Sequence, residues 1–155
     1  MIEGKLTLAT PEGTGGQFVA VSGSGHALVM DDIEGHTAAK PIEIALLALG
    51  GCTAFDVINI LRKSRQKVTG YEVALRAEQN PEPPSYFTHV EIRHRLRGDI
   101  DPKAVERALF LSETKYCSVG AMISKTAEIE HTFEIVREEE PADRTAGICS
   151  ARSRS

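Results

Sequence analysis

The chain has 155 residues, a formal net charge of −4 and 41 % hydrophobic residues. This length and balance fit one globular domain and exclude wholesale disorder, and the absence of net positive charge argues against a dedicated binder of nucleic acids or anionic membranes. The sequence shows no secretory signal and no apolar run of about 20 residues, so we expect a cytoplasmic protein without a membrane partner. The three cysteines, Cys52, Cys117 and Cys149, are an odd number, which favours available thiols over a disulfide scaffold.

The first 30 residues predict three short strands. Residues 5–8, 17–21 and 26–30 are short runs rich in apolar and β-branched side chains, and Gly-rich turns separate them. We therefore expect a small antiparallel meander.

A long helix is predicted from about residue 41 to residue 64. Pro41 suits the first helical turn. The residues before Cys52 are apolar nearly all round the helix, which predicts an enclosed first half, and the second half is amphipathic. Gly50 and Gly51 in the middle cost roughly 2 kcal/mol relative to alanines. Either another part of the chain packs closely there, or a substrate gains access to Cys52, and the two interpretations are compatible.

The next segment predicts a hairpin. Residues 68–78 and 87–98 both alternate in polarity, and the proline-rich residues 80–84 separate them. In the second strand, the set Phe87, His89, Glu91, Arg93, Arg95 and Arg97 forms the predicted solvated face. The alternate residues, from Thr88 to Gly98, form the predicted buried face.

Two further helices and a strand complete the predicted domain. Asp101 and Pro102 begin a helix, residues 116–123 form a short helix, and residues 127–136 form the last strand. This order indicates an α+β domain over residues 1–140, with antiparallel sheets around a long buried central helix. Residues 141–155 lack periodicity and are expected to form a disordered tail, in which Cys149 is incidental.

Two cysteines are the main candidates for chemistry. A helical cysteine such as Cys52 is either a small buried hydrophobic residue or an accessible thiol, and the same choice applies to Cys117. Cys117 stands where a short helix begins, two residues after Lys115. A helix N-terminus and a cation both lower the pKa of a thiol, so this context favours a reactive Cys117.

Other kinds of site have little support. The spacings Cys-x-x-Cys and His-x-x-x-His are absent, so neither a zinc site nor any other metal or cofactor is expected. The glycines near residue 15 do not form a nucleotide-binding motif. Among the five histidines, His89 is expected to be solvated and His94 and His131 to lie at sheet surfaces. Only His36, just before the long helix, stays a site candidate.

Two segments resemble motifs of the OsmC/Ohr superfamily, the osmotically inducible and organic hydroperoxide resistance proteins. Residues 40–57, KPIEIALLALGGCTAFDV, are similar to the central-helix motif of that family, and residues 111–119, LSETKYCSV, are similar to its second-cysteine segment. The resemblance spans about residues 3–138. The LGGC form around Cys52 looks most like the YhfA-like branch.

The resemblance implies a fold and an activity. It implies an intertwined homodimer with two long central helices packed together and sites at the subunit interface. It also implies a thiol peroxidase in oxidative-stress defence, in which Cys52 is the peroxidatic thiolate and Cys117 the resolving thiol. Organic or hydrogen peroxides would be the substrates, and a dithiol reductant would restore the thiols without any cofactor.

The chain departs from the family pattern at two charged positions. The peroxidases of the family pair the reactive cysteine with an N-terminal Arg and a Glu, but no Arg occurs here before Arg62. The family's Glu position corresponds to Ile42, and the candidate Glu43 is one residue later. In an unbroken helix Glu43 would point away from Cys52, whereas a break at the glycine pair would realign it.

These observations support a peroxidase that favours apolar hydroperoxides, because the first half of the helix predicts an apolar pocket. The alternative is a non-enzymatic relative that binds a small apolar ligand or senses redox state. A third possibility is a structural dimer with inert thiols.

Overall fold

The structure is a computed structural model and describes residues 1–9, 16–32 and 37–137. Within those residues, three α-helices, one π-helical turn and two three-stranded sheets confirm the α+β class. The elements in chain order are β1 (Gly4–Leu8), β2 (Phe18–Ser22), β3 (Ala27–Met30), α1 (Pro41–Lys63), β4 (Lys67–Gln79), β5 (Phe87–Asp99), α2 (Pro102–Leu111), the π-helical turn η1 (Ser112–Tyr116), α3 (Ser118–Ile123) and β6 (Glu128–Val136). His36, Cys149 and the predicted tail over residues 141–155 lie outside the described residues.

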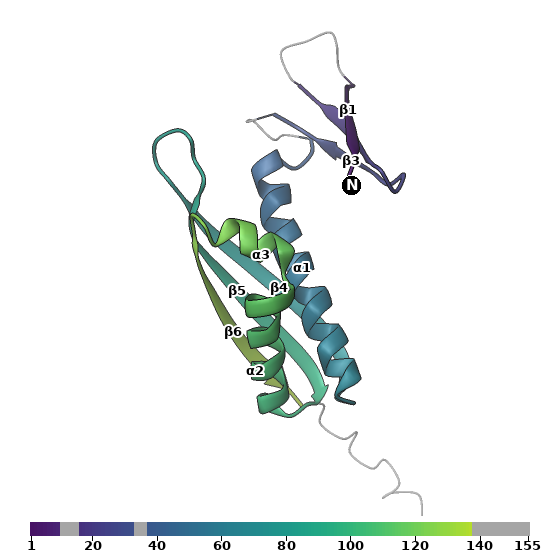
Figure 1. Cartoon of the computed structure of the whole chain (residues 1–155), viewed down its shortest axis with the longest axis vertical. Helices are drawn as coiled ribbons and strands as arrows, with labels where there is room; N and C mark the ends of the chain where they lie inside the picture. Colours follow the sequence, from purple (N-terminus) through teal and green to yellow (C-terminus); the bar gives the residue numbers. More distant parts are fainter. Residues whose placement is uncertain (10–15, 33–36, 138–155) are drawn as a thin grey trace, which may run out of the picture.

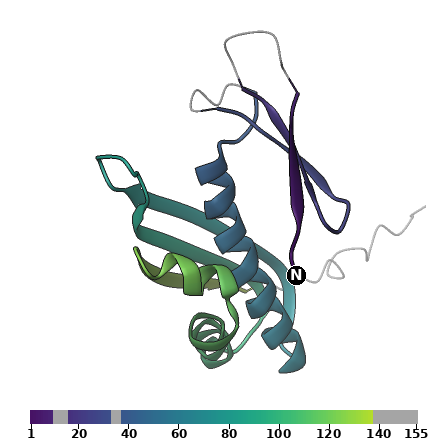
Figure 2. The ribbon, with the colours of Figure 1, turned by 45° about the horizontal axis from the view of Figure 1, so that its top comes forward.

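Strands β1, β2 and β3 form the predicted antiparallel meander, with β2 in the middle. Figures 1 and 2 show this sheet beside the start of α1, set apart from the second sheet. Large apolar side chains of the meander are exposed: Leu6, Leu8, Phe18, Val21, Leu28 and Val29. Among residues 1–9, 16–32 and 37–137, no other element covers these apolar side chains of the sheet.

The second sheet differs from the expectation of antiparallel sheets. Strands β4 and β5 form the predicted hairpin, but β6 pairs with β5 in parallel. Parallel neighbours need a crossover connection, and α2, η1 and α3 supply it between β5 and β6. Strand patterns in the sequence do not specify this direction, because it depends on where the crossover returns the chain.

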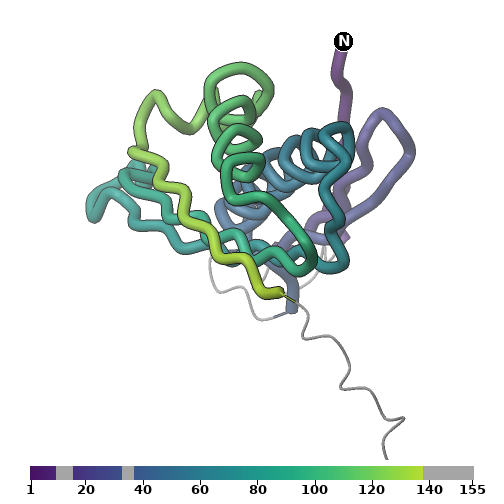
Figure 3. Tube along the Cα trace, turned by 90° about the horizontal axis from the view of Figure 1, so that it is seen from below, coloured from purple at the N-terminus to yellow at the C-terminus, as the bar shows by residue number. Residues whose placement is uncertain are grey.

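The helices cover one face of the second sheet, with α2 running beside α1 (Figure 3). Beneath them, β5 buries Val90, Ile92, His94 and Leu96 and exposes its arginines, as the alternation predicts. Phe87 is the exception, since it is buried although the pattern places it on the solvated face. The pairing register shifts between Glu78 and Gln79, so the alternation does not continue through the end of the hairpin.

Helix α1 is continuous, but its first half is not enclosed within the single chain. Leu47 in the first half is 61 % exposed, and Phe55 in the second half is 72 % exposed, because the described part of the second sheet and its helices buries only one stripe of α1. A Cβ atom on Gly50 would lie 2.5 Å from Leu75 Cδ1, whereas one on Gly51 would meet nothing within 4 Å. Close packing therefore explains Gly50, and Gly51 faces open space in this chain.

Helix α1 is also long and apolar enough, by length and composition alone, to cross a bilayer, with a mean hydropathy of 2.0 over its most apolar stretch. The central helix of a soluble domain meets the same criteria. In the structure α1 packs against β4, α2 and α3.

Candidate functional site: a cluster of two thiols and a carboxylate

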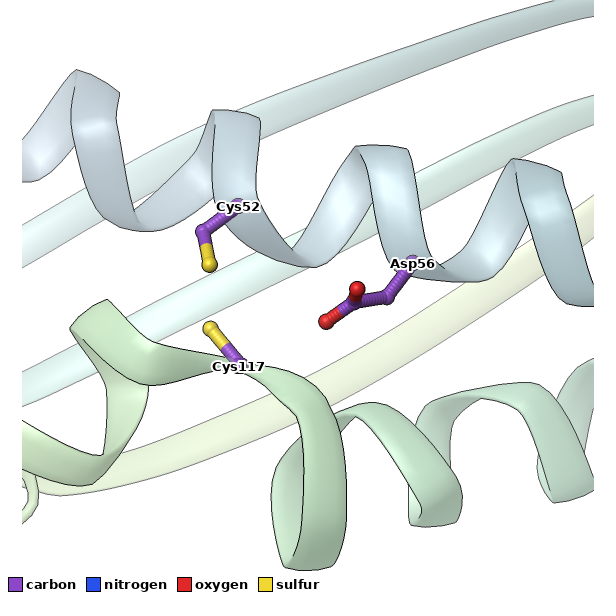
Figure 4. Close-up of side chains that lie close together, drawn as sticks. All are labelled: Cys52, Asp56 and Cys117. Carbon is purple, nitrogen blue, oxygen red and sulfur yellow. The ribbon is translucent and has the colours of Figure 1, made fainter.

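Three side chains from two distant parts of the chain meet beside α1. Cys52 and Asp56 lie one helical turn apart on α1, and Cys117 lies between η1 and α3. The two Sγ atoms and a carboxylate oxygen of Asp56 all lie within 4.8 Å of one another. Figure 4 shows the three side chains pointing toward a common centre. We call these three residues the thiol–carboxylate cluster.

The π-helical turn positions two members of the cluster at once. The Ser112 hydroxyl donates a hydrogen bond of 2.9 Å to Asp56 Oδ2, and the Ser112 carbonyl accepts one of 2.8 Å from the Cys117 N–H. Ser112 itself is fully buried. A π-turn widens the backbone locally and is frequent at functional sites. Here it fixes the carboxylate and the second thiol relative to each other.

The start of α3 holds the Cys117 sulfur. Cys117 is the N-cap residue of this helix, and its Sγ accepts a hydrogen bond of 3.2 Å from the Gly120 N–H. A Cβ atom at position 120 would lie 3.0 Å from the same sulfur. Any side chain at position 120 would crowd the Cys117 sulfur, so a glycine fits here.

The two thiols have different surroundings. Cys117 is 5 % exposed, whereas Cys52 is partly exposed. Burial raises the pKa of Cys117; the Thr53 hydroxyl, 3.5 Å from its sulfur, and the Gly120 N–H oppose this rise, and the neighbouring Cys52 adds to it. The lowering expected from the helix start is therefore present through Gly120, but burial outweighs it, and Lys115 is not among the groups that shift this pKa. The Lys115 ammonium instead lies over the Tyr116 ring, 5.3 Å from its centroid.

Glu43 does not join the cluster in the single chain. It is exposed in the first turn of α1, where its carboxylate accepts a hydrogen bond of 2.8 Å from the Lys40 N–H. Because α1 runs unbroken through the glycine pair, no realignment turns Glu43 toward Cys52. Within the described residues, the His89–Glu130 and Arg95–Glu134 ion pairs both lie outside the cluster.

Asp56 is the cluster member that the sequence analysis missed. Its signal was the spacing Cys52-x-x-x-Asp56, which places both side chains on one helix face. An Asp on the polar stripe of a helix is usually solvated, so the spacing alone did not distinguish it. Ser112 and Cys117, which give Asp56 its role, come from a segment more than 50 residues away.

A buried histidine, His94, and a half-buried one, His131, lie next to each other in the second sheet. The Tyr71 hydroxyl is 2.8 Å from His94 Nδ1, and His94 Nε2 is 3.1 Å from His131 Nδ1. Burial lowers the pKa of His94 to about 4, and the neighbouring His131 contributes; burial also lowers the pKa of His131. The sequence correctly placed His94 on the buried face of its strand. His94 does not lie at a solvent-exposed surface of the sheet, because the fold buries it. His131 and Cys117 line one cavity of about 250 Å³, together with Glu113.

A larger groove reaches the cluster from solvent. It has a volume of about 710 Å³, runs between α1 and α2, and has Asp56 among its lining residues. Ile60, Leu111 and Tyr116 give it apolar surface, and three cations line it as well: Lys63, Lys103 and Arg107.

Comparison with known proteins places the chain in a family. The family model described as "OsmC-like protein" matches residues 34–132. "Protein YhfA" of Escherichia coli (strain K12) is 44 % identical over 120 residues, which are 77 % of this chain and 90 % of that protein. A hypothetical protein from Aquifex aeolicus VF5 has 28 % identity and a TM-score of 0.79, over 90 % of this chain and 98 % of that one.

More distant structures share the fold. The organic hydroperoxide resistance protein OhrB of Bacillus subtilis has a TM-score of 0.62 over 86 % of this chain and 98 % of its own, at 10 % identity. That likeness shows the fold alone. The family model and the relative at 44 % identity go further and confirm the resemblance drawn from the two cysteine motifs. The chain belongs to the OsmC-like family, and YhfA represents its branch of that family.

Proposed function

We propose that the protein is a two-cysteine thiol peroxidase that reduces organic hydroperoxides, and hydrogen peroxide, in oxidative-stress defence. The observation that carries this proposal is the approach of Cys52 and Cys117, whose sulfurs lie within 4.8 Å of each other although 64 residues separate them. Relatives of the same fold are named organic hydroperoxide resistance proteins, which supports the reaction class.

The reaction has three balanced steps. The Cys52 thiolate attacks the terminal peroxide oxygen, and the O–O bond breaks. Cys52 becomes a sulfenic acid, and the alkoxide that leaves takes up a proton and becomes the alcohol. The Cys117 thiol then attacks the Cys52 sulfur, a disulfide forms, and the hydroxyl leaves as water with the Cys117 proton. An external dithiol reduces this disulfide by exchange and restores both thiols.

The unequal exposure of the thiols supports this order. Cys52 is partly exposed, so a peroxide can reach it, whereas the buried Cys117 is screened from solvent. The raised pKa of Cys117 keeps it as a thiol, which carries the proton that the leaving hydroxyl needs. The two sulfurs must approach to about 2.05 Å to bond, a shift that side-chain rotation has to supply.

The substrate class follows from the surroundings of the cluster. Cys52 packs against the apolar group around Leu49 and Phe87, and the groove between α1 and α2 opens at Asp56. An apolar hydroperoxide gains free energy by leaving water in such surroundings, so we propose that it is preferred over hydrogen peroxide.

A homodimer is part of the proposal. The exposed meander and the exposed Leu47 and Phe55 leave apolar surface that soluble monomers rarely present. A second copy of the chain would cover it and bring the site to the subunit interface. Like the homodimer, the cytoplasmic location and the dithiol reductant are predictions from the sequence.

Steady-state consumption of cumene hydroperoxide, with dithiothreitol as the reductant and a chelator present, tests the activity. The Cys149→Ser protein should turn over, Cys52→Ser in that background should not, and Cys117→Ser should lose most of its turnover. Glu43→Gln in the same assay tests the predicted role of Glu43. If Cys149→Ser protein consumes peroxide no faster than Cys52→Ser, the peroxidase proposal is wrong. A disulfide that forms once without turnover would instead indicate the redox-sensing alternative.

A further inference from the structure

We propose that the thiol–carboxylate cluster also binds a thiophilic divalent cation of the Zn²⁺ class, and that the bound ion masks both thiols. The binding site goes beyond the peroxidase proposal and does not depend on it. Its basis is the donor set of Cys52 Sγ, Cys117 Sγ and an Asp56 carboxylate oxygen, which converge within 4.8 Å.

The donors match the chemistry of zinc. Zn²⁺ binds thiolate sulfur at about 2.3 Å and carboxylate oxygen at about 2.0–2.2 Å in tetrahedral sites. That geometry separates two thiolates by about 3.8 Å. The donors lie within 4.8 Å of one another, so side-chain shifts of about 1 Å bring them to bonding positions. Three protein donors leave the fourth position open to water.

Neighbouring groups hold two of the donors in place. Ser112 orients Asp56 through its hydroxyl and fixes the Cys117 backbone through its carbonyl. The Gly120 N–H donates to Cys117 Sγ, a hydrogen bond that also stabilises a metal-bound thiolate. These contacts distinguish the cluster from a chance meeting of mobile surface side chains.

Binding changes the reactivity of the thiols. Zn²⁺ takes the place of the two thiol protons, which are released to solvent, and both sulfurs become metal ligands. A ligated sulfur donates electron density to the ion and is less nucleophilic than a free thiolate, so it reacts more slowly with electrophiles. The ion would therefore keep the reduced protein from oxidation until a chelating partner removes it.

A search for common zinc-binding motifs misses this site. Two of its donors lie one turn apart on α1, and the third comes from a distant part of the chain. The pair Cys52 and Asp56 has the i, i+4 spacing that places two ligands on one helix face. The third donor reaches them only through the crossover that ends at Cys117.

Metal titration of the reduced Cys149→Ser protein tests the proposal. After chelator treatment and desalting, Co²⁺ is added as a spectroscopic probe, and Zn²⁺ is then added to displace it. We expect one Co²⁺ per chain with thiolate-to-cobalt absorption and a tetrahedral spectrum, and stoichiometric displacement by Zn²⁺. Cys52→Ser and Cys117→Ser should each lose this spectrum. Asp56→Asn should weaken Zn²⁺ affinity about tenfold or more, whereas the exposed Asp99→Asn should leave it unchanged.

Two results would overturn the site. One is a parent protein that gives no thiolate-to-cobalt absorption, and the other is Asp56→Asn that binds Zn²⁺ as tightly as Asp99→Asn does. Masking is measured separately, as at least a tenfold slower reaction of the thiols with iodoacetamide when Zn²⁺ is bound, and an unchanged rate would refute it. None of these measurements uses peroxide. The peroxidase proposal can therefore fail while the metal site is confirmed, and the metal site can fail while the peroxidase proposal is confirmed.

Discussion

At the scale of single residues, the environment of each titratable side chain decides what it can do. Cys117 and His94 are both buried, but Cys117 keeps its proton because burial disfavours the thiolate, and His94 stays neutral because burial disfavours the imidazolium. The sequence singled out Cys52 and Cys117, which the structure brings together, and it predicted the buried face of β5. It could not predict Asp56 or the contact between His94 and His131, because each depends on a partner from another element.

The histidine pair predicts acid sensitivity of the fold. The folded-state pKa of His94 is about 4 and the unfolded value is about 6.5. The unfolded chain therefore binds more protons between these values, so His94 contributes its full stability above about pH 6.5 and loses it as the pH falls toward 4. The loss at pH 4 should be about 3 kcal/mol.

Urea unfolding of His94→Gln and the parent across that pH range measures this contribution. The variant should show a shallower fall in the free energy of unfolding with acid. His89→Gln, which changes a more exposed histidine, should keep the slope of the parent. Equal slopes in His94→Gln and the parent would contradict the assignment.

At the scale of elements, α1 and its glycine pair connect packing to the site. The sequence predicted the extent of the long helix, the hairpin and the start of α2, since capping residues and polarity patterns are local signals. It did not predict the parallel pairing of β6 or the exposed side of α1. Those features depend on the path of the crossover and on what covers the helix, which no local pattern encodes.

The two glycines should respond differently to alanine. Gly51→Ala should stabilise the chain by about 0.5–1 kcal/mol, because alanine favours the helix and its Cβ meets no atom within 4 Å. Gly50→Ala should be less stable than Gly51→Ala by about 1–2 kcal/mol, because its Cβ would displace Leu75. Chemical denaturation compares the two. Equal stabilities would show that α1 does not pack on β4 as described.

At the scale of the whole molecule, the exposed apolar surface predicts self-association. Phe55 is 72 % exposed on α1, and Phe110, 61 % exposed on α2, is its matched control. Phe55→Asp should convert a dimer into monomers in light scattering after size-exclusion chromatography, because a buried charge without a partner costs several kcal/mol. Phe110→Asp should leave the dimer intact. A parent protein that is monomeric at all concentrations tested would contradict the proposed assembly.

The measurement that tests the central claim most directly is the intact mass of the reduced, chelator-treated Cys149→Ser protein after stoichiometric cumene hydroperoxide. Cys52→Ser and Cys117→Ser in the same background are treated in parallel. The account predicts a loss of two hydrogens in the parent, one added oxygen in Cys117→Ser and no change in Cys52→Ser. An unchanged parent, or oxygen added to Cys52→Ser in place of Cys117→Ser, would contradict a peroxide-driven disulfide between Cys52 and Cys117.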